Sequence, residues 1–137
     1  MSDIRITAGP RRFLARLETA LAPQTCARFA AMLPYREHLI HVRWSGEACW
    51  IPLGSLDLGL GHENATSYPE PGQLLLYPGG VSETEILLAY GAVRFASKAG
   101  QLAGNHFLTI VDGRDQLRPL GELCLWHGVQ DIVFERA

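Results

Sequence analysis

The stretch RRFLARLETALAPQTCARFAAML, residues 11–33, decides the fold because its apolar period changes halfway along. Apolar and more polar side chains alternate from Phe13 to Leu17, which is typical of a strand with two unlike faces. From Pro23 onward, apolar side chains recur every three or four residues, and the first turn of a helix tolerates proline well. Pro34 then ends the segment. The stretch therefore predicts a strand followed directly by a short helix.

The rest of the chain is typical of many short strands joined by turns. Alternating or short apolar runs predict strands at residues 4–6, 38–44, 48–53, 72–77, 85–90, 93–96, 106–111 and 132–135. Residues 54–71 predict a long surface loop, and we interpret residues 117–125 as a helical turn over 117–120 followed by a strand. Because a closed sheet removes the exposed edges of short strands, these elements predict a mostly β fold that closes into a barrel.

Length and charge bound the class of protein. The 137 residues predict one domain, residues 1–137, with enough apolar side chains for a single core. The net charge is −2, and acidic and basic residues are interspersed, so no basic surface for nucleic acid or an anionic membrane is expected. No apolar run approaches the roughly 20 residues that a membrane-spanning helix needs.

The cysteines indicate the compartment. Cys26, Cys49 and Cys124 are odd in number, far apart and without a Cys-x-x-Cys pattern, which argues against a disulfide scaffold and a structural zinc site. The first residues, MSDIRITAG, also lack the pattern of a signal peptide. We expect three free thiols and a cytoplasmic location.

Two sets of motifs resemble a known fold family. The strand and the segment Ala22-Pro23-Gln24-Thr25-Cys26-Ala27-Arg28-Phe29 resemble the first strand and helix of cyclophilins. Further motifs resemble small bacterial cyclophilin-like proteins of unknown function: Pro71-Gly72, Tyr77-Pro78-Gly79-Gly80, Ser82-Glu83-Thr84-Glu85, Tyr90-Gly91, Gly100-Gln101-Leu102-Ala103-Gly104-Asn105 and Leu125-Trp126-His127-Gly128. The resemblance implies a closed eight-stranded β-barrel with one or two short helices at its ends, and it brings no established activity.

Prolyl isomerase activity does not carry over with this resemblance. Cyclophilins place a catalytic arginine in a Phe-His-Arg strand, and this chain has no Phe-His-Arg. The matching strand is either His41-Val42-Arg43-Trp44 or Ala48-Cys49-Trp50-Ile51, and only the first supplies an arginine. We therefore expect no isomerase activity.

Two polar pairs follow glycine-rich segments and are candidate ligand-binding residues. Glu63 and Asn64 lie in the loop beside His62, and Asn105 and His106 begin a strand after Gly100–Gly104. A carboxylate, amides and imidazoles suit a small polar ligand or acid–base chemistry, and barrel mouths are common ligand sites. The alternative is structural, since Asn64 and Asn105 are also typical of turns that bond to the backbone.

Glu85 and Tyr90 are further candidates on one predicted strand. Glu83 and Glu85 are two residues apart and so share a face, with Leu87 and Ala89 following on that face. A partly buried Glu85 needs a partner or a raised pKa and is a candidate acid or base, against a structural carboxylate as the alternative. Tyr90 lies on the opposite face, where it is typical of a core residue with its hydroxyl at the rim.

Signatures of cofactors and metals are weak. His62, Glu63 and His106 lack metal-ligand spacing such as His-x-x-x-His, so we expect no metal. Gly59-Leu60-Gly61 lacks the third glycine and the setting of a dinucleotide fingerprint, and no Gly-x-Ser-x-Gly motif occurs. No cofactor is expected, and no catalytic residue is assigned.

Three functions are compatible with these patterns. The first is a binding module that holds a small polar metabolite or peptide at one barrel end, using Glu63, Asn64, Tyr90, Asn105 and His106. The second is a small isomerase or hydrolase acting beside a carbonyl, with Glu63 or Glu85 as base. The third is a homo-oligomeric accessory protein. The sequence favours the first slightly.

Overall fold

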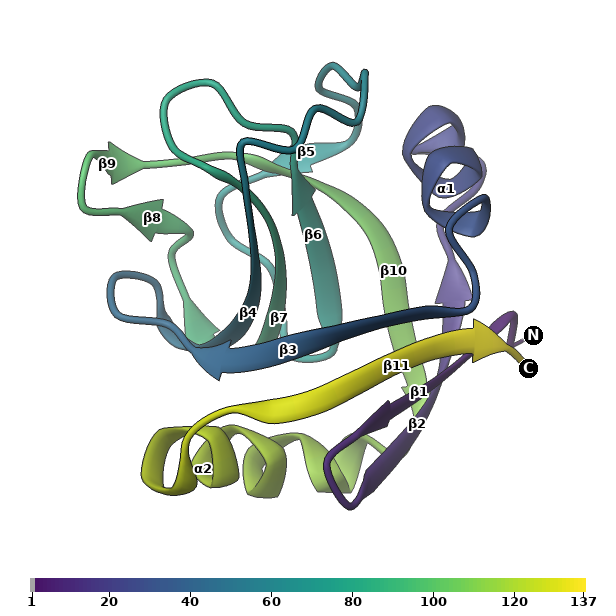
Figure 1. Cartoon of the computed structure of the whole chain (residues 1–137), viewed down its shortest axis with the longest axis vertical. Helices are drawn as coiled ribbons and strands as arrows, with labels where there is room; N and C mark the ends of the chain where they lie inside the picture. Colours follow the sequence, from purple (N-terminus) through teal and green to yellow (C-terminus); the bar gives the residue numbers. More distant parts are fainter. Residues whose placement is uncertain (1) are drawn as a thin grey trace.

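The strands of the barrel and two helices account for most of the chain (Figure 1). The computed structural model describes residues 2–137. The elements are β1 (Ile4–Ala8), β2 (Arg11–Leu17), α1 (Pro23–Ala30), β3 (Tyr35–His41), β4 (Gly46–Gly54), β5 (Ala65–Thr66), β6 (Gln73–Tyr77), β7 (Thr84–Val93), β8 (Ala96–Ser97), β9 (Gly100–Gln101), β10 (Gly104–Asp112), the 3₁₀ turn η1 (Arg114–Gln116), α2 (Leu117–His127) and β11 (Gln130–Arg136).

Eight antiparallel strands close on themselves. Their order is β2-β1-β11-β3-β4-β7-β6-β10, and β10 pairs again with β2 to complete the ring. The two-residue β5 adds to β10 within the predicted long loop, and β8 and β9 form a separate hairpin outside the ring. Each of the eight strands has a neighbour on both sides, although β3 and β4 share only the pairs Ile40–Trp50 and His41–Cys49. The predicted closed, eight-stranded, mostly β barrel is confirmed.

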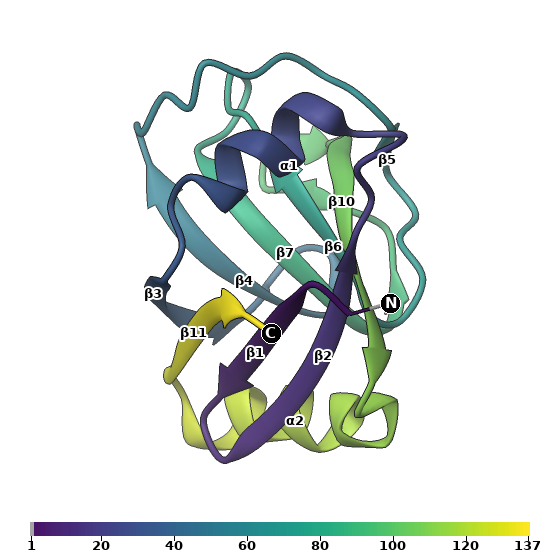
Figure 2. The same cartoon turned by 90° about the vertical axis from the view of Figure 1, so that its right-hand side faces the viewer.

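The two helices lie at opposite ends of the barrel (Figure 2). Helix α1 begins with Pro23 in its first turn, as the sequence predicts, and its Phe29 enters the core. The Phe29 ring centroid lies 5.0 Å from that of Phe107 and 5.1 Å from that of Phe134, both in edge-on geometry. No helix of residues 2–137 is long and apolar enough to cross a membrane.

The second helix corrects the prediction for residues 117–125. Instead of a helical turn followed by a strand, Leu117–His127 form one continuous helix. The buried side of α2 consists of Leu117, Leu120, Gly121 and Cys124, a spacing that only a helix places on one face. Gly121 lets the helix approach the barrel, because a Cβ there would lie 2.4 Å from the Tyr90 ring.

Two other predicted strands have different bounds in the structure. Residues 42–44 of the predicted strand 38–44 lie outside β3, and Arg43 and Trp44 belong to the bend before β4. The predicted strand 93–96 falls between the end of β7 and the start of β8. Both differences arise where the chain leaves the barrel wall, and both turn out to shape the pocket described below.

The barrel wall carries apolar cores on both faces. Ile86 and Leu88 of β7 point inward with α1 and the aromatic cluster, whereas Leu87 of the same strand belongs to a second core on the outer face. The second core also contains Ala48, Leu75, Tyr77, Phe95 and Leu102. It is covered by the segment 93–103, which leads out to the β8–β9 hairpin and back, so β4, β6 and β7 are buried on both sides.

Candidate functional site

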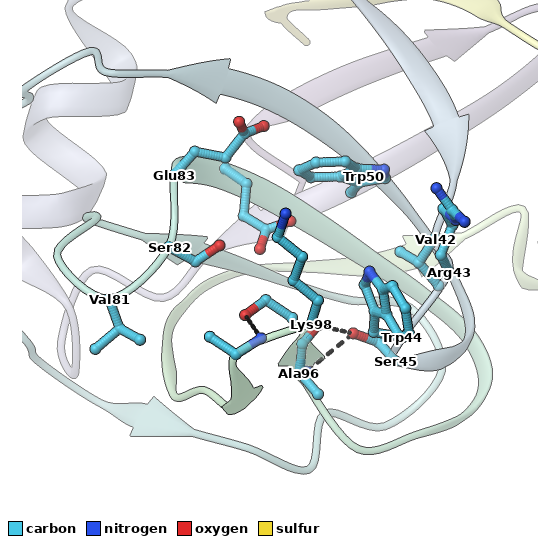
Figure 3. A pocket seen from close by; sticks show the side chains of 13 residues that line it. Val42, Arg43, Trp44, Ser45, Trp50, Val81, Ser82, Glu83, Ala96 and Lys98 are labelled. Carbon is cyan, nitrogen blue, oxygen red and sulfur yellow. Dashed lines mark hydrogen bonds between the residues drawn. The ribbon is translucent and has the colours of Figure 1, made fainter.

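A pocket lies beside this outer core (Figure 3). It has a volume of about 380 Å³. Its walls are the bend 42–45, the loop 81–83 and the hairpin 96–99, with Trp50 of β4 and Glu85 of β7 from the barrel itself. Three segments that are far apart in the sequence therefore meet over one face of β4 and β7.

Hydroxyl groups fix these walls to the barrel. Ser45 donates its Oγ hydrogen to the carbonyl of Ala96 at 2.9 Å and accepts the Ala96 N–H at 3.0 Å. Tyr77 Oη accepts the N–H groups of Val81 at 3.1 Å and Ser82 at 3.3 Å. These side-chain bonds add to backbone bonds outside the barrel ladder, such as the one from the Arg94 N–H to the carbonyl of Ser45 at 3.1 Å.

Glu85 is the most unusual residue of the pocket. It is only 5% exposed, and its carboxyl forms no hydrogen bond with any group of residues 2–137. Burial, together with the nearby charge of Glu83, raises the pKa of Glu85 from 4.5 to about 8. Glu83 and Glu85 line the same pocket, as their two-residue spacing predicts. A group with this pKa is able to donate or accept a proton near neutral pH.

The pocket also holds cationic and aromatic side chains. Arg43 lies over the ring of Trp44, with its guanidinium carbon 5.6 Å from the ring centroid, and Trp44 is 54% exposed. Lys98, the one lysine of the sequence, lies on the hairpin and extends over the pocket in Figure 3. Trp50 forms part of the wall and packs against the outer core.

The structure brings the two predicted polar pairs together, away from this pocket. Asn105 is fully buried and its Oδ1 accepts the Glu63 N–H at 3.1 Å, while its Nδ2 donates to Thr25 Oγ1 at 3.1 Å and to Gly61 O at 2.9 Å. Asn64 donates from Nδ2 to the carbonyl of residue 106 at 2.9 Å. These amides hold the long loop against β10.

Glu63 also acts on helix α1. Its carboxylate accepts the N–H of Thr25, one of the free donors in the first turn, which the preceding Ala22 has no side chain to satisfy. The negative charge is favourable at this end of the helix dipole. We call Glu63, Asn64, Asn105 and Thr25 the helix-cap network; every polar interaction described for it is made within the protein, and ligand binding there stays a prediction.

His106 extends this region through a chain of hydrogen bonds. Thr109 donates its hydroxyl hydrogen to Glu18 Oε2 at 2.6 Å and therefore accepts from His106 Nε2 at 2.7 Å. Burial lowers the pKa of His106. Burial alone would raise the pKa of Glu18, but hydrogen bonds from Thr109 and Arg16 outweigh that effect and lower it. The arrangement keeps His106 neutral and Glu18 ionised.

Tyr90 is not brought to the other predicted site residues. Its hydroxyl lies 2.8 Å from His41 Nε2, and because His41 donates Nδ1–H to the carbonyl of Val42, Tyr90 is the donor of that bond. Arg118 of α2 lies over the Tyr90 ring at 5.3 Å. Tyr90 therefore joins β7 to β3 and α2. Within residues 2–137, no group of three or more His, Cys, Asp or Glu residues could hold a metal ion.

Sequence reasoning missed several residues of the pocket. Trp44, Trp50 and Lys98 were not singled out, and Arg43 was considered only as a stand-in for the cyclophilin arginine. One available signal was the outward face of β4, where Ala48, Trp50 and Pro52 alternate with inward side chains, because a tryptophan on an outer face needs a covering. The three free cysteines, Cys26, Cys49 and Cys124, are all buried and lie outside the pocket.

Comparisons with known proteins agree with this fold. The family model described as "Protein of unknown function (DUF3830)" matches residues 4–135, so the chain belongs to that family. No curated protein sequence matches the chain. Among solved structures, McbB in complex with tryptophan has a TM-score of 0.76 at 18% identity; the match covers 97% of this chain but only 44% of McbB.

Two further structures match over nearly their whole length. The hypothetical protein AF2241 from Archaeoglobus fulgidus has a TM-score of 0.65 at 20% identity, and 99% of this chain covers 95% of it. A cyclophilin-type peptidyl-prolyl cis-trans isomerase from Cryptosporidium parvum has a TM-score of 0.61 at 14% identity, with 99% and 97% coverage. At these identities the similarity shows the cyclophilin-like fold alone.

Proposed function

We propose that this member of the DUF3830 family binds a small polar metabolite or a short peptide in the pocket beside Glu85. The observation that carries the proposal is the buried Glu85 carboxyl, which faces the pocket without a hydrogen-bond partner from the protein. The carboxyl reaches solvent only through the pocket, so a ligand that displaces the water there has to supply its hydrogen-bond partner.

The size and walls of the pocket support the same function. Small-molecule pockets typically enclose roughly 300–1,000 Å³ and combine apolar walls with a few polar groups. This pocket, at about 380 Å³, has Trp44 and Trp50 for apolar contact and charged groups for orientation. The related barrel of McbB was solved in complex with tryptophan, which supports a small ligand as the kind of occupant for such a fold.

Acid–base catalysis beside a carbonyl is the second candidate. It is favoured by the pKa of Glu85, about 8, which keeps the carboxyl largely protonated at pH 7. In that form Glu85 would donate a proton to a carbonyl oxygen or a leaving group, and as the carboxylate it would accept one. Binding comes first in both candidates, so one experiment addresses the shared step.

The test uses the three tryptophans as reporters. The indole N–H signals of Trp44, Trp50 and Trp126 are followed by NMR while free amino acids, short peptides, organic acids and sugars are added. We expect a ligand to shift Trp44 and Trp50 but not Trp126, which does not line the pocket. Glu85→Gln should weaken binding at least tenfold, and the matched control Glu122→Gln on α2 should not. Shifts confined to residues near Asn105 would move the site to the helix-cap network.

The compartment and the assembly are further parts of the proposal. Three buried free thiols support a reducing compartment such as the cytoplasm. Leu125, Trp126 and Val129, at 49%, 76% and 57% exposure, support an accessory role through a contact of this end of the barrel with another protein chain. Analytical ultracentrifugation of the wild type and Trp126→Ser tests self-association.

A further inference from the structure

The pocket contains four ionisable side chains, two acidic and two basic, that form no ion pair within residues 2–137. They are Arg43, Lys98, Glu83 and Glu85. The four ion pairs formed within residues 2–137 join Arg5 to Glu135, Arg16 to Glu18, His38 to Asp131 and Arg118 to Glu47, all outside the pocket. None of the four pocket groups donates or accepts a side-chain hydrogen bond with described residues either. Charges of both signs are thus free to meet a ligand.

Acidic and basic groups both face the pocket. In Figure 3, Glu83 and Arg43 lie at opposite ends, and Lys98 extends from the hairpin toward the Glu83 end. Glu85 is close enough to Glu83 for the charge of Glu83 to raise the pKa of Glu85. A ligand that fills the pocket therefore meets carboxyl groups and one cation toward one end, a second cation at the other end, and the tryptophans of the wall.

We infer that the ligand is a zwitterion, either a free α-amino acid or a short peptide with both termini free. Its ammonium group binds Glu83 and Glu85, its carboxylate binds Lys98 in an amino acid or reaches Arg43 in a peptide, and its apolar part packs on Trp50 and Trp44. This inference rests on the proposed binding function and names its ligand class. Charge-assisted hydrogen bonds are stronger than neutral ones, and the guanidinium of Arg43 has the fork geometry that suits a carboxylate.

Ligands of one charge fit the same site less well. An anion satisfies Lys98 and Arg43 but brings negative charge toward Glu83, and an amine satisfies Glu83 but meets two cations. A neutral ligand leaves Glu83, Lys98 and Arg43 without a charged partner. A ligand with both charges pairs groups of both signs, which is why the inference selects zwitterions among small polar metabolites.

The experiment compares matched probes. Twenty free L-amino acids and their glycyl dipeptides are screened by the tryptophan NMR signals, and calorimetry measures the tightest binder. Its amine analogue without the carboxylate, its acid analogue without the ammonium and its N-acetyl amide are then measured. We expect each of the three to bind at least tenfold more weakly than the zwitterion. The comparison of amino acids with dipeptides separates the two sources of the shared chemistry.

Lys98 permits a second, independent measurement. Reductive methylation with ¹³C-formaldehyde labels Lys98, the one lysine of the chain, together with the N-terminal amine, and keeps both charges. The Lys98 signal should shift with the zwitterion and the acid analogue but not with the amine analogue. In Lys98→Met, the zwitterion should bind only about as well as the amine analogue, whereas Lys98→Arg should retain most of the affinity.

The outcomes separate this inference from the wider proposal. If an uncharged or singly charged probe binds as tightly as the zwitterion at Trp50, the zwitterion inference is wrong and the binding function stands. If no amino acid or dipeptide shifts Trp44 or Trp50 at millimolar concentration, the zwitterion inference is also wrong. The response of the same signals to sugars and organic acids then decides the binding function by itself.

Discussion

The helix-cap network and the pocket contain the same kinds of residue but treat them in opposite ways. In the network, Glu63 accepts a helix N–H and Asn105 makes three hydrogen bonds within the protein. In the pocket, Glu85 is only 5% exposed but has no hydrogen-bond partner within residues 2–137. The difference teaches that burial alone does not identify a functional carboxylate. Whether the fold itself supplies the partner separates a structural group from a group available to a ligand.

The largest expected effect concerns Glu85 and pH. Its pKa is about 8 in the folded protein against 4.5 ordinarily, so the folded state binds the proton more tightly. Stability from this group is complete below pH 4.5 and is lost as the pH rises through 8. The loss is on the order of 4 kcal/mol by linkage. Urea unfolding at several pH values should show it in the wild type and not in Glu85→Gln.

An equal pH dependence in Glu85→Gln would contradict this account. Glu83→Gln sharpens the measurement, because removal of the neighbouring charge lowers the pKa of Glu85. The fall in the free energy of unfolding should then end at a lower pH. At pH 9, Glu83→Gln should have a larger free energy of unfolding than the wild type.

Substitutions in the helix-cap network should reduce stability without reducing ligand affinity. Asn105→Leu removes three hydrogen bonds and leaves polar atoms of Thr25, Gly61 and Glu63 without this partner, in the case of Thr25 a buried one. We expect a loss of about 3 kcal/mol in the free energy of unfolding. Asn105→Asp, which keeps the acceptor for the Glu63 N–H, should lose less. Ligand affinity at the pocket should stay the same in every variant that remains folded, and a parallel loss would join the two regions into one site.

A smaller effect is expected at the helix start. Glu63→Ala removes the acceptor for the Thr25 N–H and the favourable charge at this end of α1. Loss of a cap typically costs about 1 kcal/mol. Thermal unfolding measures the change, and Glu70→Ala, an exposed carboxylate in the same long loop, is the control. Glu63→Gln keeps an acceptor and should stay within roughly 0.5 kcal/mol of the wild type.

The last prediction is an absent effect. The chain has the cyclophilin-like fold but no Phe-His-Arg motif. A protease-coupled assay on a proline tetrapeptide should therefore show no acceleration above background. Acceleration that disappears in Arg43→Ala would give the pocket a prolyl isomerase function and identify Arg43 as the replacement arginine.

The sequence predicted what depends on local period and missed what depends on distant contacts. The strand and helix of residues 11–33 follow from a change of period that needs no tertiary context. The meeting of Glu63 with Asn105 also follows, because loops before barrel strands gather at a rim. Helix α2 was missed because the two-residue spacing of Leu123 and Leu125 is also typical of a strand. The helix is stabilised by packing against Tyr90, a close approach that Gly121 permits.

The pocket itself was beyond the sequence for a different reason. The shared face of Glu83 and Glu85 is readable from their spacing, but Lys98 and Trp44 meet them only because separate segments fold over the outside of the barrel. That arrangement depends on single hydroxyl contacts, such as those of Ser45 and Tyr77, which have no periodic signature.

These hydroxyl contacts separate the pocket from the scaffold that carries it. Ser45 holds the hairpin, Tyr77 holds the loop 81–83, and Ser67 donates to the carbonyl of Leu102 at 2.7 Å in the segment between. The barrel keeps its own ladder of backbone bonds whatever these side chains do. Substitutions of these hydroxyl side chains can therefore change the pocket while the backbone ladder of the barrel is kept.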